Sequence, residues 1–124
     1  MPYLLVAVGS AIGGAARFGI ADVLWGWRAE DPFAFGTWVV NILGSFVVAF
    51  VNTVAMREGA LTPEWRLFLA TGICGGFTTY SAFNWQIGAL LEDRPWAAGG
   101  YVAATLLGGL VAYAAGVGCA RALT

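Results

Sequence analysis

Hydrogen-bond donors inside long apolar stretches are the residues of this sequence that could do chemistry. A guanidinium at Arg17, an amide at Asn41 and hydroxyls at Tyr101 and Thr105 each lie within such a stretch. None of them is a carboxylate, the group that proton-coupled transport across a membrane requires. The set therefore favours a polar path in which fixed donors replace the water around a small anion.

The run Gly72–Phe83 combines three glycines with the hydroxyls that directly follow them. Glycine weakens a helix, and hydroxyl side chains compete for its backbone hydrogen bonds. We therefore expect a break near Gly75, which lies about 15 Å from Trp65 and so near the bilayer midplane. Carbonyls freed at Gly75 and Thr78 could hold a small hard cation, as unwound carbonyls do in transport proteins. The hydroxyls belong to Thr78, Thr79 and Ser81.

Two aromatic side chains, Tyr80 and Phe83, come next and are three residues apart. Residues at that spacing share a helical face, and an aromatic pair of this kind usually packs against its neighbours. Ring edges also carry positive partial charge, so edges that line a pore could replace part of an anion's hydration. Both interpretations remain open at this point.

Each donor also has a purely structural explanation. Arg17 could extend to the lipid headgroups, and a hydrogen bond between helices could account for Asn41. The rise of a helix nevertheless places both residues about 9 Å from the same membrane surface, where the amide of Asn41 could offer two N–H bonds to an anion. The residues expected in this half of the membrane are Arg17, Asn41, Tyr80, Phe83, Tyr101 and Thr105.

Two pairs of glycines have the spacing that is typical of closely packed membrane helices. One pair is Gly9 and Gly13, and the other is Gly72 and Gly76. The spacing by itself indicates close packing of the helices that contain these residues, so the second pair has a structural explanation besides the expected break.

The elements that must hold the donors are apolar segments long enough to cross a bilayer. The chain is 60% hydrophobic and only 10% charged, against roughly 25% charged in a soluble domain. A bilayer core of about 30 Å needs about 20 residues per helix, so four spans use nearly the whole chain. The sequence predicts an all-α membrane protein with one transmembrane domain over residues 1–124. The spans are expected at roughly 3–25, 35–56, 66–91 and 96–120.

The charges bear on partners and orientation. A net charge of −1 leaves no basic surface that would indicate nucleic-acid binding. Four spans place Arg57, Arg66 and Arg121 on one side of the membrane, and Arg28 and Arg94 on the other. This bias is too small for the positive-inside rule to fix one orientation. Either the chain simply has few charges, or it inserts both ways and pairs as an antiparallel homodimer, which would build an inverted repeat from two copies.

With these residues in view, the sequence resembles the Fluc fluoride channels, also called the CrcB family, along nearly its full length. The resemblance rests on the runs Gly9–Phe18, Phe35–Phe46 and Gly72–Phe83, of which the latter two together are specific. It implies a dual-topology antiparallel homodimer in the cytoplasmic (inner) membrane. It also implies two fluoride pathways and a central structural sodium ion.

The resemblance also implies roles for single residues. Asn41 is then the pore amide, and Tyr80 and Phe83 occupy the two phenylalanine positions that line the path. Gly75 and Thr78 supply the sodium-binding carbonyls. Arg17 matches the arginine of the first span, and Tyr101 and Thr105 match the polar track of the fourth. The expected fluoride pathway consists of Asn41, Tyr80, Phe83, Thr79, Ser81, Tyr101, Thr105 and Arg17.

Three residues depart from the family pattern. Tyr80 stands where phenylalanine is usual, Ala82 where threonine is usual, and Gln86 where glutamate is common. The fold does not depend on these positions. They leave two assemblies open, a homodimer with two conducting pathways and a heterodimer in which this chain is one subunit.

The expected function is passive, selective export of fluoride to relieve its toxicity, and not an enzymatic reaction. One alternative is a small dual-topology drug antiporter coupled to protons, but Asp22 lies too close to the membrane surface to serve as its carboxylate. A second is a subunit that only packs and does not transport, which would not need the donors.

Overall fold

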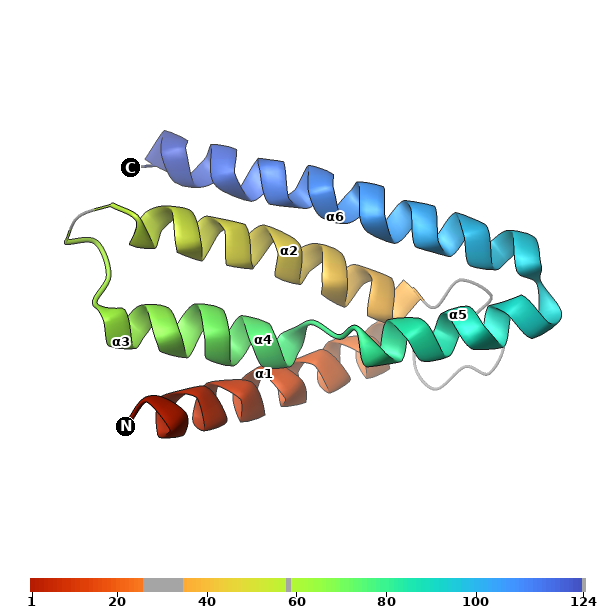
Figure 1. Ribbon diagram of the computed structural model, residues 1–124, viewed down its shortest axis with the longest axis horizontal. Helices are drawn as coiled ribbons and strands as arrows, with labels where there is room; N and C mark the ends of the chain where they lie inside the picture. Colours follow the sequence, from red (N-terminus) through yellow and green to blue (C-terminus); the bar gives the residue numbers. More distant parts are fainter. Residues whose placement is uncertain (26–34, 58, 124) are drawn as a thin grey trace.

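The described part of the chain is entirely helical in its regular structure. A computed structural model describes residues 1–25, 35–57 and 59–123, and in these ranges it contains helices but no strands (Figure 1). The all-helical prediction is therefore confirmed for the described residues. The depth of each residue in the membrane stays a prediction.

Within the described ranges, three helices are long and apolar enough to cross a bilayer. They are α1 (Pro2–Trp25), α2 (Phe35–Ala55) and α6 (Pro95–Leu123). Each coincides with one of the expected spans, namely the first, the second and the fourth. Leucines and tryptophans at their surfaces are extensively exposed, including Leu107 at 65% and Trp96 at 76%, as a chain whose surroundings are lipid or a second subunit requires.

The remaining expected span is a series of short helices. These are α3 (Pro63–Arg66), the π-helix η1 (Leu67–Cys74), α4 (Gly75–Phe77) and α5 (Ser81–Asp93). The series begins at Pro63, three residues before the predicted start, because Thr62 caps it: the Thr62 hydroxyl accepts the Trp65 N–H at 3.3 Å. A capping threonine followed by proline is a favoured start for a helix.

The helical path is interrupted between α4 and α5. Thr78 has extended backbone angles, with φ −80° and ψ 154°, and Figure 1 shows the extended connection between the two helices. The sequence places the break near Gly75, whereas Gly75 itself is helical, with φ −64° and ψ −39°. The interruption therefore follows the glycines and falls on the hydroxyl residues.

The glycines before the interruption allow α1 to pack closely on η1 and α4. A Cβ added at Gly9 would lie 2.7 Å from the Phe68 carbonyl oxygen and 2.8 Å from the Gly72 Cα, and one at Gly76 would overlap the backbone of Ser10. Backbone contact of this kind excludes any side chain. The two glycine pairs therefore pack helices together, and this packing explains why the chain stays helical through them.

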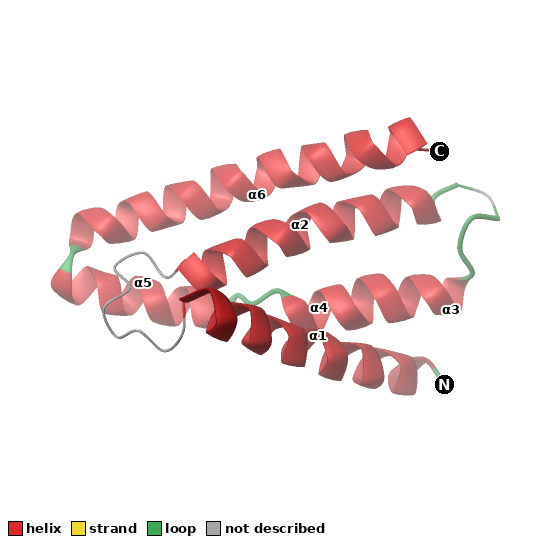
Figure 2. Cartoon of the chain, turned by 180° about the vertical axis from the view of Figure 1, so that it is seen from behind, coloured by secondary structure: helices red, strands yellow, loops and turns green. Residues whose placement is uncertain are grey.

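The helix α2 packs against α6 on one side, and on its other side it contacts both α1 and the α3–α4 segment (Figures 1 and 2). Glycines allow close approach here too: a Cβ on Gly108 of α6 would lie 2.8 Å from the Ile42 Cδ1 of α2. A small buried cluster joins α5 to α6 and consists of Phe83, Leu90, Ala98 and Tyr101.

Candidate functional site

The amide of Asn41 is bonded to the interrupted segment at two points. The Thr79 N–H donates to Asn41 Oδ1 at 2.9 Å, and Asn41 Nδ2 donates to the Thr79 carbonyl oxygen at 3.1 Å. One side chain of α2 thus satisfies a donor and an acceptor of backbone that has left the helix. One N–H of the amide is committed to Thr79, and the second remains for another acceptor.

Hydroxyl groups supply further bonds around the interruption. Thr78 Oγ1 donates to the Cys74 carbonyl oxygen at 3.0 Å, which closes the last turn of α4. Thr79 Oγ1 accepts the Ala82 N–H at 3.1 Å and lies 3.4 Å from Ser81 Oγ. The Thr79 hydroxyl therefore satisfies a backbone N–H in the first turn of α5, whose N-cap residue is Tyr80. These residues explain why the helix both ends and restarts here.

Arg17 faces the end of α4. Its Nε donates to the Gly76 carbonyl oxygen at 3.4 Å, and the side chain is half-buried. The last carbonyls of a helix carry partial negative charge, which makes this a favourable place for a guanidinium. The bond to Gly76 gives Arg17 a partner inside the bundle.

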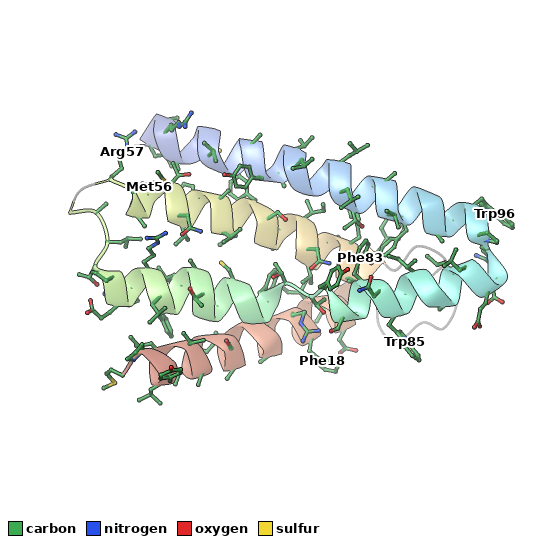
Figure 3. All side chains as sticks on the ribbon, in the orientation of Figure 1. Phe18, Met56, Arg57, Phe83, Trp85 and Trp96 are labelled. Carbon is green, nitrogen blue, oxygen red and sulfur yellow. The ribbon has the colours of Figure 1, made fainter. Side chains whose placement is uncertain are left out.

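The two aromatic residues differ in their surroundings. Phe83 is 8% exposed and Tyr80 is 76% exposed, and their ring centroids are 6.5 Å apart. Phe83 also lies against Tyr101, with centroids 5.2 Å apart and the rings tilted by 45°. Figure 3 shows Phe83 pointing into the bundle and Trp85 pointing away from it. Within a single chain, Phe83 therefore belongs to the interior and Tyr80 to the surface.

A chain of hydrogen bonds connects three helices next to Phe83. The Tyr101 hydroxyl donates to Gln86 Oε1 at 2.9 Å, and Gln86 Nε2 donates to Thr37 Oγ1 at 2.8 Å. The amide of Gln86 fixes the direction of this chain because its oxygen only accepts and its nitrogen only donates. The Thr37 oxygen receives a hydrogen bond, so its own O–H is free to donate elsewhere.

Thr37 was not among the residues predicted from the sequence. It lies four residues before Asn41, so the two share a face of α2, and the spacing could have indicated it. Thr105 is the predicted residue with the least support from its contacts: its Oγ1 is buried and has no hydrogen-bond partner among the described residues. Tyr101, one turn earlier on α6, is fully buried.

The predicted site residues, together with Gln86 and Thr37, fall into two neighbouring groups. The first surrounds the interruption, and the second lies between α5 and α6. Phe83 of α5 joins them, because its ring approaches both Tyr80 and Tyr101. The first group comprises Arg17, Asn41, Gly75, Thr78, Thr79, Tyr80 and Ser81. The second comprises Phe83, Tyr101, Thr105, Gln86 and Thr37.

These features define a class. Apolar helices long enough to span a bilayer pack with an interrupted helix, some of whose backbone groups bond to half-buried polar side chains. Irregular backbone at membrane depth is found where it is enclosed by protein or lines an ion path. The chain is a multi-pass membrane protein with the architecture of ion-transport proteins.

The chain belongs to the CrcB family. The model of that family, described as "CrcB-like protein, Camphor Resistance (CrcB)", matches residues 4–117. Similar proteins bear the name "Fluoride-specific ion channel FluC". One from Anaeromyxobacter sp. (strain K) is 47% identical over 111 residues, which cover 88% of this chain and 86% of the relative. One from Gloeobacter violaceus is 43% identical over 124 residues, covering 97% and 96%. A third, from Chlorobium chlorochromatii, is 40% identical over 119 residues, covering 95% and 91%. Ion channels are not enzymes, and the family assigns no enzymatic reaction to this chain.

Proposed function

We propose that this chain is a fluoride channel that lets fluoride leave the cell passively across the cytoplasmic (inner) membrane and so relieves fluoride toxicity. The observation that carries the proposal is the similarity to proteins named as fluoride-specific channels, which extends over nearly the full length of both chains. The donors described above agree with this function, since hydroxyl, amide and ring-edge groups can replace the water around a small anion.

The proposed path runs along the two groups of site residues. The second N–H of Asn41 and the O–H of Thr37 are donors on one face of α2, one helical turn apart. The edge of Phe83 continues the path towards Tyr101, and Thr105 lies one turn further along α6. Arg17 supplies a positive charge near the path, although its Nε is already bonded to Gly76. Thr79 and Ser81 belong to the path through their hydroxyls, and Tyr80 contributes its ring on the exposed face of α5.

The working unit is proposed to be an antiparallel dimer of two identical chains that insert in opposite orientations. Two features support a second copy. Gly75 is exposed, and a Cβ added there would meet nothing within 4 Å. The sequence predicts that Gly75 lies at the bilayer midplane, so a second copy could pack against it there. Tyr80, assigned to the path, is exposed in one chain and would need a partner to enclose it. In this arrangement, the third spans of the two copies cross each other at the two-fold axis, near the interruption at Thr78–Tyr80.

A sodium ion is proposed as a structural element at that axis. The residues fit such an ion. The ligands would be the backbone carbonyl oxygens of Gly75 and Thr78, which are hard ligands of the kind that sodium takes in transport proteins. Within the described ranges there is no cluster of His, Cys, Asp or Glu side chains that would favour a transition metal instead. When bound, the ion would neutralise partial negative charge where the two copies meet.

A growth experiment tests this function. Expression of the chain in a bacterium that lacks its own fluoride exporter is expected to restore growth in millimolar fluoride, whereas an empty vector does not. A proton-coupled drug antiporter would instead confer resistance to cationic dyes, which are therefore tested in parallel. Dye resistance without fluoride resistance would contradict the proposal, and rescue only on co-expression with a homologous chain would indicate a heterodimer.

A further inference from the structure

The interrupted segment diverts two backbone donors from their helical acceptors. In a continuous helix, the N–H of residue i+4 donates to the carbonyl of residue i. The Gly75 carbonyl would therefore accept from the Thr79 N–H, and the Thr78 carbonyl would accept from the Ala82 N–H. These are the two carbonyls assigned to the sodium ion.

Both donors are taken by side chains instead. The Thr79 N–H donates to Asn41 Oδ1 at 2.9 Å, and the Ala82 N–H donates to Thr79 Oγ1 at 3.1 Å. The intervening Gly76 carbonyl differs from these two because it accepts a hydrogen bond from Arg17 Nε at 3.4 Å. The side chains around the break thus distinguish among neighbouring carbonyls, and they leave the Gly75 and Thr78 oxygens without their helical donors.

We propose that Asn41 and Thr79 are positioning residues for the central cation site, because they hold away the two N–H groups that would otherwise occupy its carbonyl ligands. The inference rests on the proposed function, of which the cation site is a part. It gives Asn41 a second role besides that of a pore donor. The same amide has one edge bonded to Thr79 and one N–H left for the anion path, so it connects the two sites.

The reason for expecting a measurable effect is competition. Without the Asn41 oxygen, the Thr79 N–H can return to the Gly75 carbonyl, and a cation must then break that hydrogen bond in order to bind. Without the Thr79 hydroxyl, the Ala82 N–H can return to the Thr78 carbonyl in the same way. Because each bond would form in both copies of a dimer, we expect the apparent affinity for sodium to fall by about tenfold in either case.

The test measures cation binding rather than transport. The thermal unfolding midpoint of the purified full chain in detergent is followed as sodium chloride replaces N-methylglucamine chloride at constant ionic strength. The wild-type midpoint is expected to rise with sodium. The half-saturating sodium concentration is expected to increase about tenfold in Asn41→Leu and in Thr79→Val.

Two matched variants serve as controls. Asn52→Leu makes the same chemical change on the same helix, but Asn52 bonds to Arg66 at 3.3 Å, away from the break. Thr79→Ser keeps the hydroxyl that accepts the Ala82 N–H. Both are expected to stay within about threefold of the wild type. If Asn41→Leu does not fold, the comparison of Thr79→Val with Thr79→Ser decides the question.

An unchanged half-saturating concentration in a folded Asn41→Leu or Thr79→Val protein would overturn the inference, as would a wild-type midpoint that does not respond to sodium. Failure of the proposed function looks different. A wild-type protein that responds to sodium but passes no fluoride would contradict the channel and leave the positioning roles intact.

Discussion

Fluoride efflux through Asn41→Ala is expected to be roughly 10- to 100-fold slower than through the wild type. A hydrogen bond to an ion contributes about 1.5–3 kcal/mol, and losing such a donor from the path raises the barrier by a comparable amount. The substitution also removes both bonds to Thr79, so the segment that carries the neighbouring hydroxyls loses its support. The measurement is the initial rate of fluoride release from liposomes at matched protein density.

Asn52→Ala is the matched control for this prediction, because it truncates an amide on the same helix whose partner, Arg66, lies at the end of the bundle. Its efflux rate is expected to equal that of the wild type. Phe83→Ala is expected to slow efflux as well, since it removes the ring that joins the two groups of site residues. Undiminished efflux in both Asn41→Ala and Phe83→Ala would contradict the site assignment.

The second large effect is expected from a single methyl group at the contact between α1 and η1. A Cβ at Gly13 would overlap the Ile73 carbonyl oxygen and lie 2.8 Å from the Phe77 backbone nitrogen. Backbone atoms cannot move aside as a side chain can, so the helices must separate. Gly13→Ala is therefore expected to lower the free energy of unfolding by about 1–3 kcal/mol, measured as a fall in the thermal midpoint.

Gly19→Ala is the matched control on the same helix, because a Cβ there would meet nothing within 4 Å. At a helical position with open space, alanine is favoured over glycine by about 0.5–1 kcal/mol. The two substitutions are therefore expected to change stability in opposite directions. Equal midpoints for Gly13→Ala and Gly19→Ala would show that the close contact between α1 and η1 does not limit stability.

Much of the fold could be predicted from the sequence because the relevant signals are local. Length and hydropathy locate the helices α1, α2 and α6. The spacing of Gly9 and Gly13 predicts that α1 packs closely on another helix. The polar residues inside apolar segments could likewise be identified, since charged and amide groups are rare at such positions.

The details of the third span could not be predicted in the same way. The run Leu67–Cys74 contains no residue type that distinguishes a π-helix from an α-helix, and its close contact with Gly9 and Gly13 of α1 joins residues far apart in the sequence. The sequence places the break near Gly75 because glycines weaken an isolated helix and the hydroxyls that follow them compete for its backbone. In the folded chain the neighbouring glycines are held by α1, and the helix ends only where Asn41 and Thr79 compete for its backbone.

Long-range partners were the other limit. The sequence indicates that Asn41 needs hydrogen bonds, but not that the Thr79 backbone supplies them from 38 positions away. The bond between Gln86 and Thr37 spans 49 positions, and Gln86 has significance only once that partner is known. Where glutamate would place a negative charge, Gln86 places a neutral amide, which orients the hydroxyls of Tyr101 and Thr37.

The measurement that tests the central claim most directly is anion efflux from liposomes that contain the purified wild-type chain alone, with no proton gradient imposed. Fluoride is expected to leave rapidly down its own gradient, and chloride is expected to remain inside because it is too large for closely spaced donors. Fluoride release no faster than from protein-free liposomes, or equal release of fluoride and chloride, would contradict the proposal that this chain forms a fluoride-selective channel.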